Sequence, residues 1–495
     1  MRRSSELTPL VAEDASSPRS SSASRALRRS STRSSLLVVA GVALLVTFAF
    51  VIRQESSLSS VKNLKGVTNH YERPQEDFFC GITNHETRYI KLPNKDDDHY
   101  FYWFVESRSD PQKDPLVLWL TGGPGCSSMM ALLAENGPCH VQSDLSTKTN
   151  PYSWNGQANV IWLDQPTGVG YSYGPKVDYD SGELNVGENI YWFLQEFLKN
   201  HPDLADREFF VTGESYGGHY VPAAARHILK ANMLRHSSSD TVHINLAGIA
   251  VGNGLTDPAV QYQHSVDMAF NSYNVSLLDD KAIEDMRKAQ LVCHELIQQC
   301  QKERLTCLDA MEFCFGALEG PYYQSGRNPY DIREPCVEEN VMKCFHFEHI
   351  DKYLNSPTVL EKLGVDTHKS KPWRECDATV GAGFVFDEMV SSAEDVKVLL
   401  DAGVRVLIYA GDADLMCNWV GNQAWVLALD WSGKLAFNSA PNRVFGTSDA
   451  SDAGRVRSFE NLAFIRVFNS GHMVPMDQPA VSFEMINKFL HNEEF

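Results

Sequence analysis

The stretch that decides the fold is "REFFVTGESYGGHYVPAAARHILKAN", residues 207–232. Its first seven residues form an apolar run typical of a buried strand, and its last fourteen have a helical pattern. Between them "GESYG" (213–217) matches G-x-S-x-G, the sharp strand-to-helix turn that holds a serine Oγ clear of its own backbone. The stretch therefore predicts a strand, a tight turn and a helix, with Ser215 as a candidate nucleophile.

Glu214, directly before that serine, is unexpected. Its carboxylate would oppose the negative charge that develops when a serine attacks a carbonyl group. A glutamate at this position therefore needs a role of its own.

Further apolar runs precede and follow this stretch and alternate with helical patterns. Continuous apolar runs are typical of strands covered on both faces, as in a parallel sheet. One intervening segment, residues 182–203, has apolar residues at helical spacing and ends at Asn200 to Pro202. The alternation predicts an α/β fold, with a mostly parallel central sheet and helices on both faces. The expected strands are 99–107, 115–120, 158–164, 207–213, 244–254, 404–411 and 463–471.

Residues from about 255 to 350 interrupt this alternation, and we interpret them as a disulfide-stapled helical cap inserted over the sheet. Four cysteines recur here at a regular spacing: Cys293, Cys300, Cys307 and Cys314. They would lie on one face of a single helix, or they would pair as nested bridges across a helical hairpin. There is no C-x-x-C pair and no histidine at finger spacing, so we expect no metal site and no cofactor. Eleven cysteines in the chain predict disulfides with one thiol left over.

The N-terminal region differs from the rest in charge and hydropathy. Residues 1–34 carry seven arginines and three acidic residues, a net charge of +4. Because the whole chain has a net charge of −19, the remaining residues carry −23. We interpret them as a disordered basic cytosolic tail, 35–52 as a signal-anchor or a cleaved signal peptide, and 53–75 as a stalk or pro-segment. The acidic body argues against a nucleic-acid partner. The sequon at Asn274 predicts a glycosylation site and suits a translocated chain.

Acidic and basic side chains stand where later expected strands end. Asp412 and Asp414 follow "VRVLIYAG", and His472 follows "AFIRVFNSG". The chain order Ser…Asp…His is that of α/β-hydrolases, in which a histidine takes the serine proton and an acid orients the histidine. Spacing alone leaves the choice between Asp412 and Asp414 open.

An oxyanion in such a site needs preorganised N–H donors. The N–H of Tyr216 is the natural first donor, and the glycine-rich "LWLTGGPGCSS" (118–128) would supply the second. A phosphate loop is the rival interpretation, which the absence of G-K-[ST] makes weak.

Four blocks in order, "LTGGPGCSS", "GESYGGHYVP", "YAGDADLMCNW" and "NSGHMVPMDQP", resemble the signatures of the serine carboxypeptidase family, closest to its plant carboxypeptidase III branch. The likeness extends from about Tyr71 to the C-terminus. It implies an α/β-hydrolase fold over 76–495, a Ser215–Asp414–His472 triad, and an oxyanion hole formed by the N–H groups of Gly123 and Tyr216.

The resemblance also implies a role for Glu214. With Glu135, Trp119, Thr121 and Gly122 it would bind the C-terminal carboxylate of a peptide. Two buried carboxyl groups close together cannot both ionise cheaply, and a protonated one donates a hydrogen bond to a carboxylate. Binding should then be best at acidic pH. Most of the family has asparagine where this chain has Thr121, and a hydroxyl offers one donor where an amide offers two.

Further implications concern the pockets and the cysteines. Met416, Cys417 and Tyr216 would line a pocket on the acyl side of the scissile bond, and Met473 and Tyr330 the leaving-residue side, with an apolar preference. Cys417 would be the unpaired thiol. The disulfides implied by the family are Cys126–Cys376, Cys293–Cys314, Cys300–Cys307 and Cys336–Cys344, which leaves Cys80–Cys139 to pair.

The leading hypothesis is a serine-type carboxypeptidase that releases C-terminal residues from peptides or proteins through an acyl-enzyme at acidic pH. It would act on the lumenal side of the endomembrane system, in a vacuole or lysosome-like organelle, or outside the cell, with or without a membrane anchor. The alternatives are an acyltransferase of the same fold that uses ester donors and a non-catalytic, membrane-anchored binding protein. The sequence leaves homodimerisation open.

Overall fold

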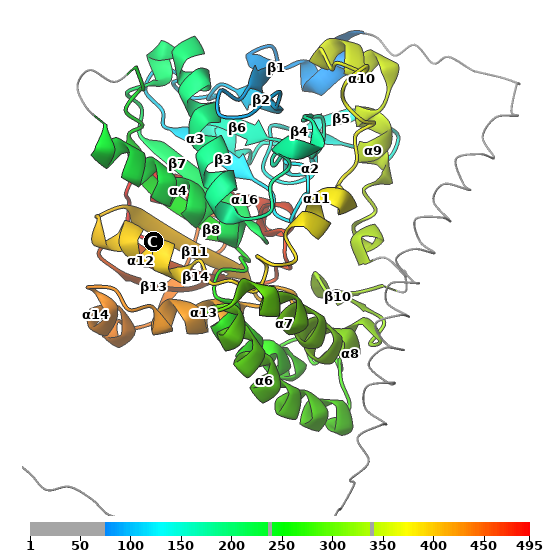
Figure 1. Cartoon of the computed structure of the whole chain (residues 1–495), viewed down its shortest axis with the longest axis vertical. Coiled ribbons are helices and arrows are strands. Elements are labelled where there is room, and N and C mark those ends of the chain that lie inside the picture. The colour runs from blue at the N-terminus through cyan, green and yellow to red at the C-terminus, as the bar shows by residue number, and fades with distance from the viewer. Residues whose placement is uncertain (1–74, 236–239, 337–340) are drawn as a thin grey trace, which may run out of the picture. The chain divides into compact units, whose positions relative to one another are not determined.

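A ten-stranded sheet forms the centre of the computed structural model (Figure 1). Its spatial order is β1-β2-β6-β3-β7-β8-β11-β14-β13-β12. The six strands from β6 to β14 in this order run parallel, whereas the pairs at both edges are antiparallel. The strands are β1 His85–Lys91, β2 His99–Val105, β3 Leu116–Leu120, β6 Asn159–Leu163, β7 Phe209–Glu214, β8 Leu246–Gly252, β11 Arg405–Gly411, β12 Arg443–Phe445, β13 Gly454–Phe459 and β14 Leu462–Val467.

The parallel strands are the apolar runs of the sequence, and their burial explains their composition. Every residue of β3, β6 and β7 is buried, because helices cover the sheet on both faces. All seven expected strands are present, and the predicted α/β-hydrolase type of fold is confirmed.

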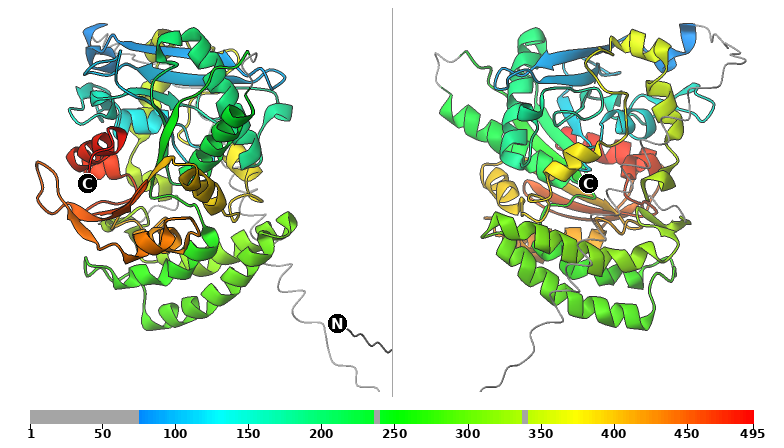
Figure 2. Two further views of the ribbon diagram at one scale, coloured as in Figure 1. Left: turned by 90° about the vertical axis from the view of Figure 1, so that its left-hand side faces the viewer. Right: turned by 45° about the vertical axis from the view of Figure 1, so that its right-hand side comes forward.

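Helices pack on each face of the sheet (Figure 2). The expected helix within 182–203 is α3, and it packs against α4, the helix that follows Ser215. The first face holds α3 Glu183–Asn200, α4 Gly217–Leu234, α11 Ala378–Gly383, α12 Ala393–Asp401, α13 Trp419–Ala428 and α14 Lys434–Ser439. The second holds α2 Met129–Ala134, α9 Glu348–Leu354, α10 Pro357–Leu363, α15 Val474–Asp477 and α16 Pro479–Leu490.

The predicted helical cap forms a separate apolar cluster beyond the carboxyl ends of the parallel strands. Its helices lie together at the lower end of Figure 1. They are α5 Pro258–Gln261, α6 Asp280–Cys300, α7 Cys307–Cys314 and α8 Gly320–Tyr323, with the π-helix η8 Phe315–Glu319 and the short strands β9 Arg327–Asn328 and β10 Asp331–Pro335. A further small sheet joins β4 Cys139–Val141 and β5 Thr147–Thr149.

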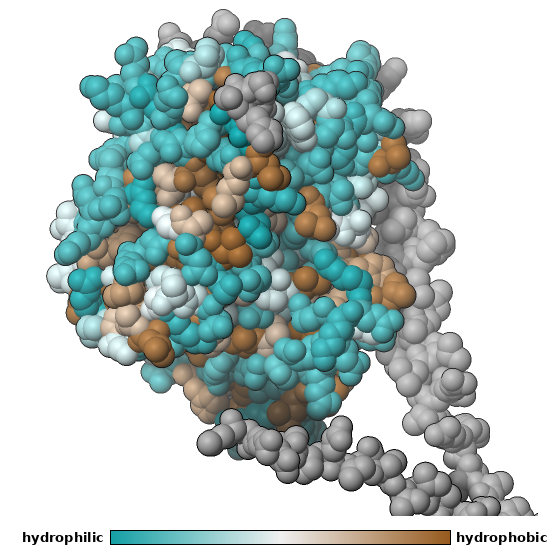
Figure 3. Space-filling view, turned by 60° about the vertical axis from the view of Figure 1, so that its left-hand side comes forward, coloured by the Kyte–Doolittle hydropathy of each residue, from teal (hydrophilic) through white to brown (hydrophobic). Residues whose placement is uncertain are grey.

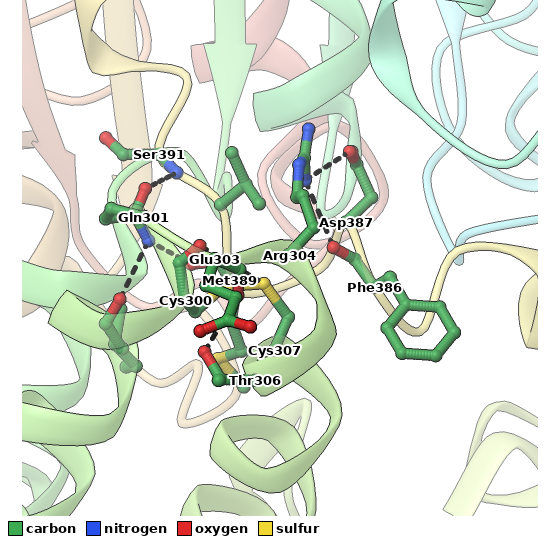
Figure 4. The surroundings of a disulfide bond; sticks show 12 residues. Cys300, Gln301, Glu303, Arg304, Thr306, Cys307, Phe386, Asp387, Met389 and Ser391 are labelled. Atoms are coloured by element: carbon green, nitrogen blue, oxygen red, sulfur yellow. Dashed lines mark hydrogen bonds and ion pairs between the residues drawn. A yellow bond between two sulfur atoms is a disulfide. The ribbon is translucent and has the colours of Figure 1, made fainter.

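The tip of the cap hairpin is fastened to the segment 386–391 (Figure 4). The Gln301 side chain donates to the Met389 carbonyl at 2.7 Å and accepts from the Ser391 N–H at 3.0 Å. Arg304 pairs with Asp387 at 2.8 Å. The cap is therefore held by polar contacts around its Cys300–Cys307 disulfide as well as by the disulfide itself.

Five disulfides are present: the four pairs that the family resemblance implies, and the pair of the two cysteines that it left over, Cys80 and Cys139. The four regularly spaced cysteines form nested bridges across the α6–α7 hairpin, one of the two arrangements that spacing left open. Cys417 is buried and unpaired. The bridges are Cys80–Cys139, Cys126–Cys376, Cys293–Cys314, Cys300–Cys307 and Cys336–Cys344.

The structure describes residues 75–235, 240–336 and 341–495. The predicted tail (1–34), membrane segment (35–52) and almost all of the stalk (53–75) lie outside these ranges. Within them, no helix combines the length and apolar character that crossing a bilayer requires. The face seen in Figure 3 is largely hydrophilic, with hydrophobic residues in small separate groups, which is ordinary for a folded domain.

Candidate active site

Ser215 occupies the tight turn between β7 and α4. Its φ is +61°, a left-handed conformation that is uncommon for a residue other than glycine and that marks a strained turn. The turn is held by its backbone, because Ser215 N–H donates to Gly252 O at 3.1 Å and Ser215 O accepts from Leu255 N–H at 2.9 Å. Gly213 is required beside it, since a Cβ there would lie 2.3 Å from Leu120 O. The turn therefore has the predicted nucleophile-elbow geometry.

Asp414 and His472 form a buried pair after β11 and β14. His472 Nδ1 lies 2.8 Å from Asp414 Oδ2, and their exposed fractions are 3% and 0%. An ionised carboxylate only accepts hydrogen bonds, so Nδ1 carries the proton and Nε2 is left as the basic nitrogen. The Met416 and Cys417 N–H groups also donate to Asp414, at 3.0 and 3.2 Å.

Asn253 supports this pair from the end of a neighbouring strand, and sequence reasoning missed it. It follows β8, the strand between β7 and β11, and its amide donates to Asp414 Oδ2 at 2.8 Å. Its Oδ1 accepts from Gly411 N–H at 2.9 Å, which fixes the amide orientation. The rule that pointed to Asp412, Asp414 and His472, a polar residue at the end of an apolar run, would have found Asn253 in "AVGNG".

Asp412 is turned away from the catalytic pair. It pairs with Arg466 at 3.0 Å and accepts from the Asn469 N–H at 3.0 Å. Its role in this structure is to hold the start of the loop that carries His472. Geometry therefore selects Asp414 as the partner of the histidine, which the sequence pattern could not do.

The glycine-rich loop after β3 packs directly against the nucleophile. A Cβ on Gly122 would lie 2.3 Å from Tyr216 N and 2.9 Å from Ser215 Cβ, so no side chain fits there. Gly123 has a φ of +111°, which glycine adopts readily. This approach places the loop that carries Gly123 next to Tyr216, and the N–H groups of these two residues are the candidate oxyanion donors.

Glu135 and Glu214 form a buried acid pair beside the serine. Glu135 caps the C-terminus of α2, Glu214 ends β7, and neither is more than 2% exposed. Their carboxyl groups lie close enough to shift each other's pKa, and neither oxygen of Glu135 has a hydrogen-bond partner among the described residues. Two buried carboxyl groups that lie close together cannot both ionise cheaply, so a proton on one of them is favoured.

Burial is the main cause that raises the pKa of both groups. The pKa of Glu214 is raised well above its usual range, because the negative charges of Glu135 and then Asp414 add to its desolvation. At acidic pH the pair is therefore protonated.

Trp119 lies in β3, and Thr121 is the first residue after that strand. The indole Nε1–H of Trp119 donates to Thr121 Oγ1 at 2.9 Å, and the Thr121 N–H donates to Ser128 Oγ at 3.1 Å. Because its oxygen already accepts, the Thr121 hydroxyl is oriented to donate its own proton to a third group.

The candidate pocket residues divide between two places. Met416 and Cys417 line one cavity beneath the cap. The Tyr330 ring lies edge-on to the His472 ring with centroids 5.0 Å apart, and Met473 is buried next to the histidine in sequence. Burial raises the pKa of the Cys417 thiol well above its usual range, so it is not a reactive thiolate.

The Tyr216 side chain is directed elsewhere. It stacks on His219 with centroids 4.4 Å apart and donates to Asp387 at 3.2 Å. Since the cavity of Met416 and Cys417 is not lined by it, Tyr216 contributes its backbone to the site more directly than its ring.

Two further predicted positions lie away from this site. Asn274 is exposed, on a turn with a φ of +57°, where a glycan could be attached. In the described ranges, no three or more His, Cys, Asp or Glu side chains are grouped so that they could hold a metal ion.

Comparison with known proteins agrees with this geometry. The family model described as serine carboxypeptidase matches residues 78–492. This chain belongs to the serine carboxypeptidase family. A serine carboxypeptidase-like protein of Oryza sativa subsp. japonica is 41% identical over 82% of this chain and 92% of its own length, which is consistent with the resemblance to a plant branch.

Two other serine carboxypeptidase relatives extend the comparison. Carboxypeptidase Y of Candida albicans is 40% identical over 80% of this chain and 72% of its own length. The crystal structure of a prohormone-processing carboxypeptidase from Saccharomyces cerevisiae superposes with a TM-score of 0.73, at 27% identity, over 82% of this chain and 91% of that chain. Membership in this family makes the chain a serine hydrolase of the carboxypeptidase type.

Proposed function

We propose that this protein removes single residues from peptide C-termini at acidic pH through an acyl-enzyme. The observation that supports this most strongly is the buried acid pair, Glu135 and Glu214, next to a serine in a nucleophile elbow. A serine hydrolase needs no such pair for its chemistry. A site for the free carboxylate of a peptide terminus does.

The chemistry follows the order of the groups. His472 Nε2 takes the proton of Ser215 Oγ, which attacks the last peptide carbonyl, while Asp414 stabilises the imidazolium. The Gly123 and Tyr216 N–H groups stabilise the oxyanion. The C–N bond then breaks, the C-terminal residue leaves with the histidine proton, and water hydrolyses the ester by the same route.

The pH dependence follows from the sign of the pKa shifts. When protonated, Glu135 and Glu214 donate hydrogen bonds to the substrate carboxylate, and when ionised they repel it. Their pKa values are raised, so the donors are present at acidic pH and are lost as the pH rises through those values. Affinity for a free terminal carboxylate should therefore fall toward alkaline pH.

We also propose a cellular location for the catalytic domain. Five disulfides within the described residues favour an oxidising compartment, the lumen of the endomembrane system or the outside of the cell. An anchor in the apolar segment 35–52 would keep the catalytic domain on that side of the membrane.

The alternatives are separated by substrate. A blocked dipeptide and a glucose ester with an alcohol acceptor, assayed in parallel, compare peptidase with acyltransferase activity, and we expect release of the C-terminal amino acid from the dipeptide. A fluorophosphonate should label the wild-type protein and leave Ser215→Ala unlabelled. Labelling of neither protein would favour a binding protein, and acyl transfer without peptide hydrolysis would overturn the proposal.

A further inference from the structure

The cavity that contains Met416 and Cys417 also contains a carboxyl group, that of Glu319 in the cap. This cavity adjoins the catalytic groups on two sides. Leu255 in its lining donates its N–H to the Ser215 carbonyl at 2.9 Å, and Cys417 donates its N–H to Asp414 at 3.2 Å. The cavity therefore lies beside the turn that carries Ser215 and the loop that carries Asp414.

Glu319 is placed by an irregularity in the cap. It is the last residue of the π-helix η8, and such helices are rare and often occur at functional sites. It is 8% exposed, and both oxygens are oriented by tyrosines. Tyr262 OH donates to Oε1 at 2.7 Å, and Tyr323 OH donates to Oε2 at 3.2 Å.

The groups that face Glu319 are acidic or neutral. Three tyrosines lie near it: Tyr262 of η6 (Tyr262–Phe270), Tyr323 of α8, and Tyr330 in the segment after β9. Cys417 also lines the cavity. Glu388 is the other nearby carboxyl group. Among the residues that the structure describes, no lysine or arginine lines the cavity. A buried carboxylate with hydrogen bonds but no cation lacks a counter-charge.

We propose that Glu319 gives the acyl-side pocket a preference for peptides with lysine or arginine as the penultimate residue. The inference rests on the proposed carboxypeptidase function. The aliphatic stem of such a residue would pack on Leu255, Leu415 and Met416, and its charged end would reach the carboxylate. The expectation of a purely apolar pocket, drawn from Met416 and Cys417 alone, overlooks this residue.

The preference should increase with pH. Burial raises the pKa of Glu319 to about 7, and burial together with the charge of Glu319 raises the pKa of Glu388 to about 8, so Glu319 ionises first. Lysine stays charged over this range. Below pH 7 the neutral pocket should accept apolar and basic residues more evenly, and above it the carboxylate should favour the cation.

A pair of blocked dipeptides with the same C-terminal residue and either lysine or norleucine before it tests the inference. Norleucine has the aliphatic chain of lysine without the amine. The measurement is the ratio of kcat/KM for the two peptides from pH 5 to pH 8. Because both peptides end alike, the pH dependence of carboxylate binding cancels in the ratio. We expect the lysine-to-norleucine ratio to rise about tenfold, the scale of one charge-assisted hydrogen bond.

Two variants test whether Glu319 causes the pH dependence of the lysine-to-norleucine ratio. Glu319→Gln should flatten the pH dependence of the ratio, whereas Glu295→Gln, which removes an exposed charge from α6 of the same cap, should keep it. A ratio that does not change with pH in the wild-type protein, or a rise that Glu319→Gln retains, would overturn the inference. Hydrolysis of neither peptide would instead contradict the proposed function, and the wild-type ratio is informative even if Glu319→Gln does not fold.

Discussion

The carboxyl edge of the sheet and the cap above it are stabilised in different ways. At the sheet edge, Ser215, Asn253, Asp414 and His472 each follow one of four adjacent parallel strands, and strand register sets their positions. In the cap, α6 buries only four of its twenty-one residues, and two of those are half-cystines that bridge to α7. For comparison, ten of the eighteen residues of α3 are buried.

The difference assigns different tasks to the two regions. A catalytic group must be held to within a fraction of an ångström, and strands packed on both faces provide that rigidity. A pocket that selects substrates can be built on an element stapled at a few points, whose surface can vary without disturbing the sheet. The catalytic groups therefore belong to the sheet edge, and Glu319 and its tyrosines belong to the cap.

The largest expected effect concerns the sheet edge. Asp414→Asn should lower kcat by about 10⁴-fold, because the amide can donate to Nδ1 and so favours the wrong histidine tautomer. Asp412→Asn is the matched control on the same loop, and its effect on kcat should be far smaller since Asp412 contacts Arg466 and the Asn469 N–H rather than the imidazole. Steady-state kinetics on a blocked dipeptide measure both. Equal losses in the two variants would contradict the geometric choice of Asp414.

Removing a cap disulfide should affect stability more than chemistry. The Cys293–Cys314 bridge spans 21 residues and the Cys300–Cys307 bridge spans 7, so loop-closure entropy predicts losses of about 3 and about 2 kcal/mol. Removal of the Cys300–Cys307 bridge should be tolerated better, because Gln301 and Arg304 still hold the tip of the α6–α7 hairpin against the segment 386–391 (Figure 4). Denaturant unfolding of the paired Cys→Ser variants measures this order.

If the cap is the separable region that this comparison implies, both disulfide variants keep a fluorophosphonate-reactive serine under native conditions. Loss of labelling in a folded variant would show that the catalytic groups depend on the cap after all.

The smallest expected effect concerns Thr121. Thr121→Asn would add a second donor near the acid pair and should lower KM for a free-acid dipeptide about two- to fivefold, with kcat little changed. The amide of the same dipeptide is the control, because it has no carboxylate to bind and its KM should not improve. A rise in KM for the free acid would mean that the Trp119-to-Thr121 hydrogen bond matters more than the extra donor.

The sequence was sufficient for the centre of the fold but not for its edges. The parallel strands are continuous apolar runs and were all predicted. The strands β1, β12 and β13, at the two ends of the sheet, were not, because "HETRYIK" and "GRVRSF" carry charged residues and show no apolar run. The charged residues of β1 are exposed or half-buried, and the arginines of β13 are half-buried. Edge strands commonly carry such charges, which discourage pairing with other chains.

Some residues of the candidate site could likewise be predicted from the sequence, and others could not. Local pattern alone pointed to Ser215, and strand ends pointed to His472 and to either Asp412 or Asp414. The family resemblance was needed for Glu135, since a glutamate that ends a helix before Asn136-Gly137-Pro138 has an ordinary structural explanation. Glu319 could not be predicted from the sequence, because its burial arises from an irregular helix and from tyrosines 57 and 4 residues away.

The pH profile of a free-acid peptide against its C-terminal amide is the most direct test of the protonated acid pair. For the free acid, kcat/KM should be highest at acidic pH and fall as Glu135 and Glu214 ionise. The amide should react more weakly and lack that fall. Replacing both glutamates with glutamine, whose amide donors do not titrate, should remove the fall for the free acid. Superimposable profiles for the acid and the amide in the wild-type protein would contradict the account.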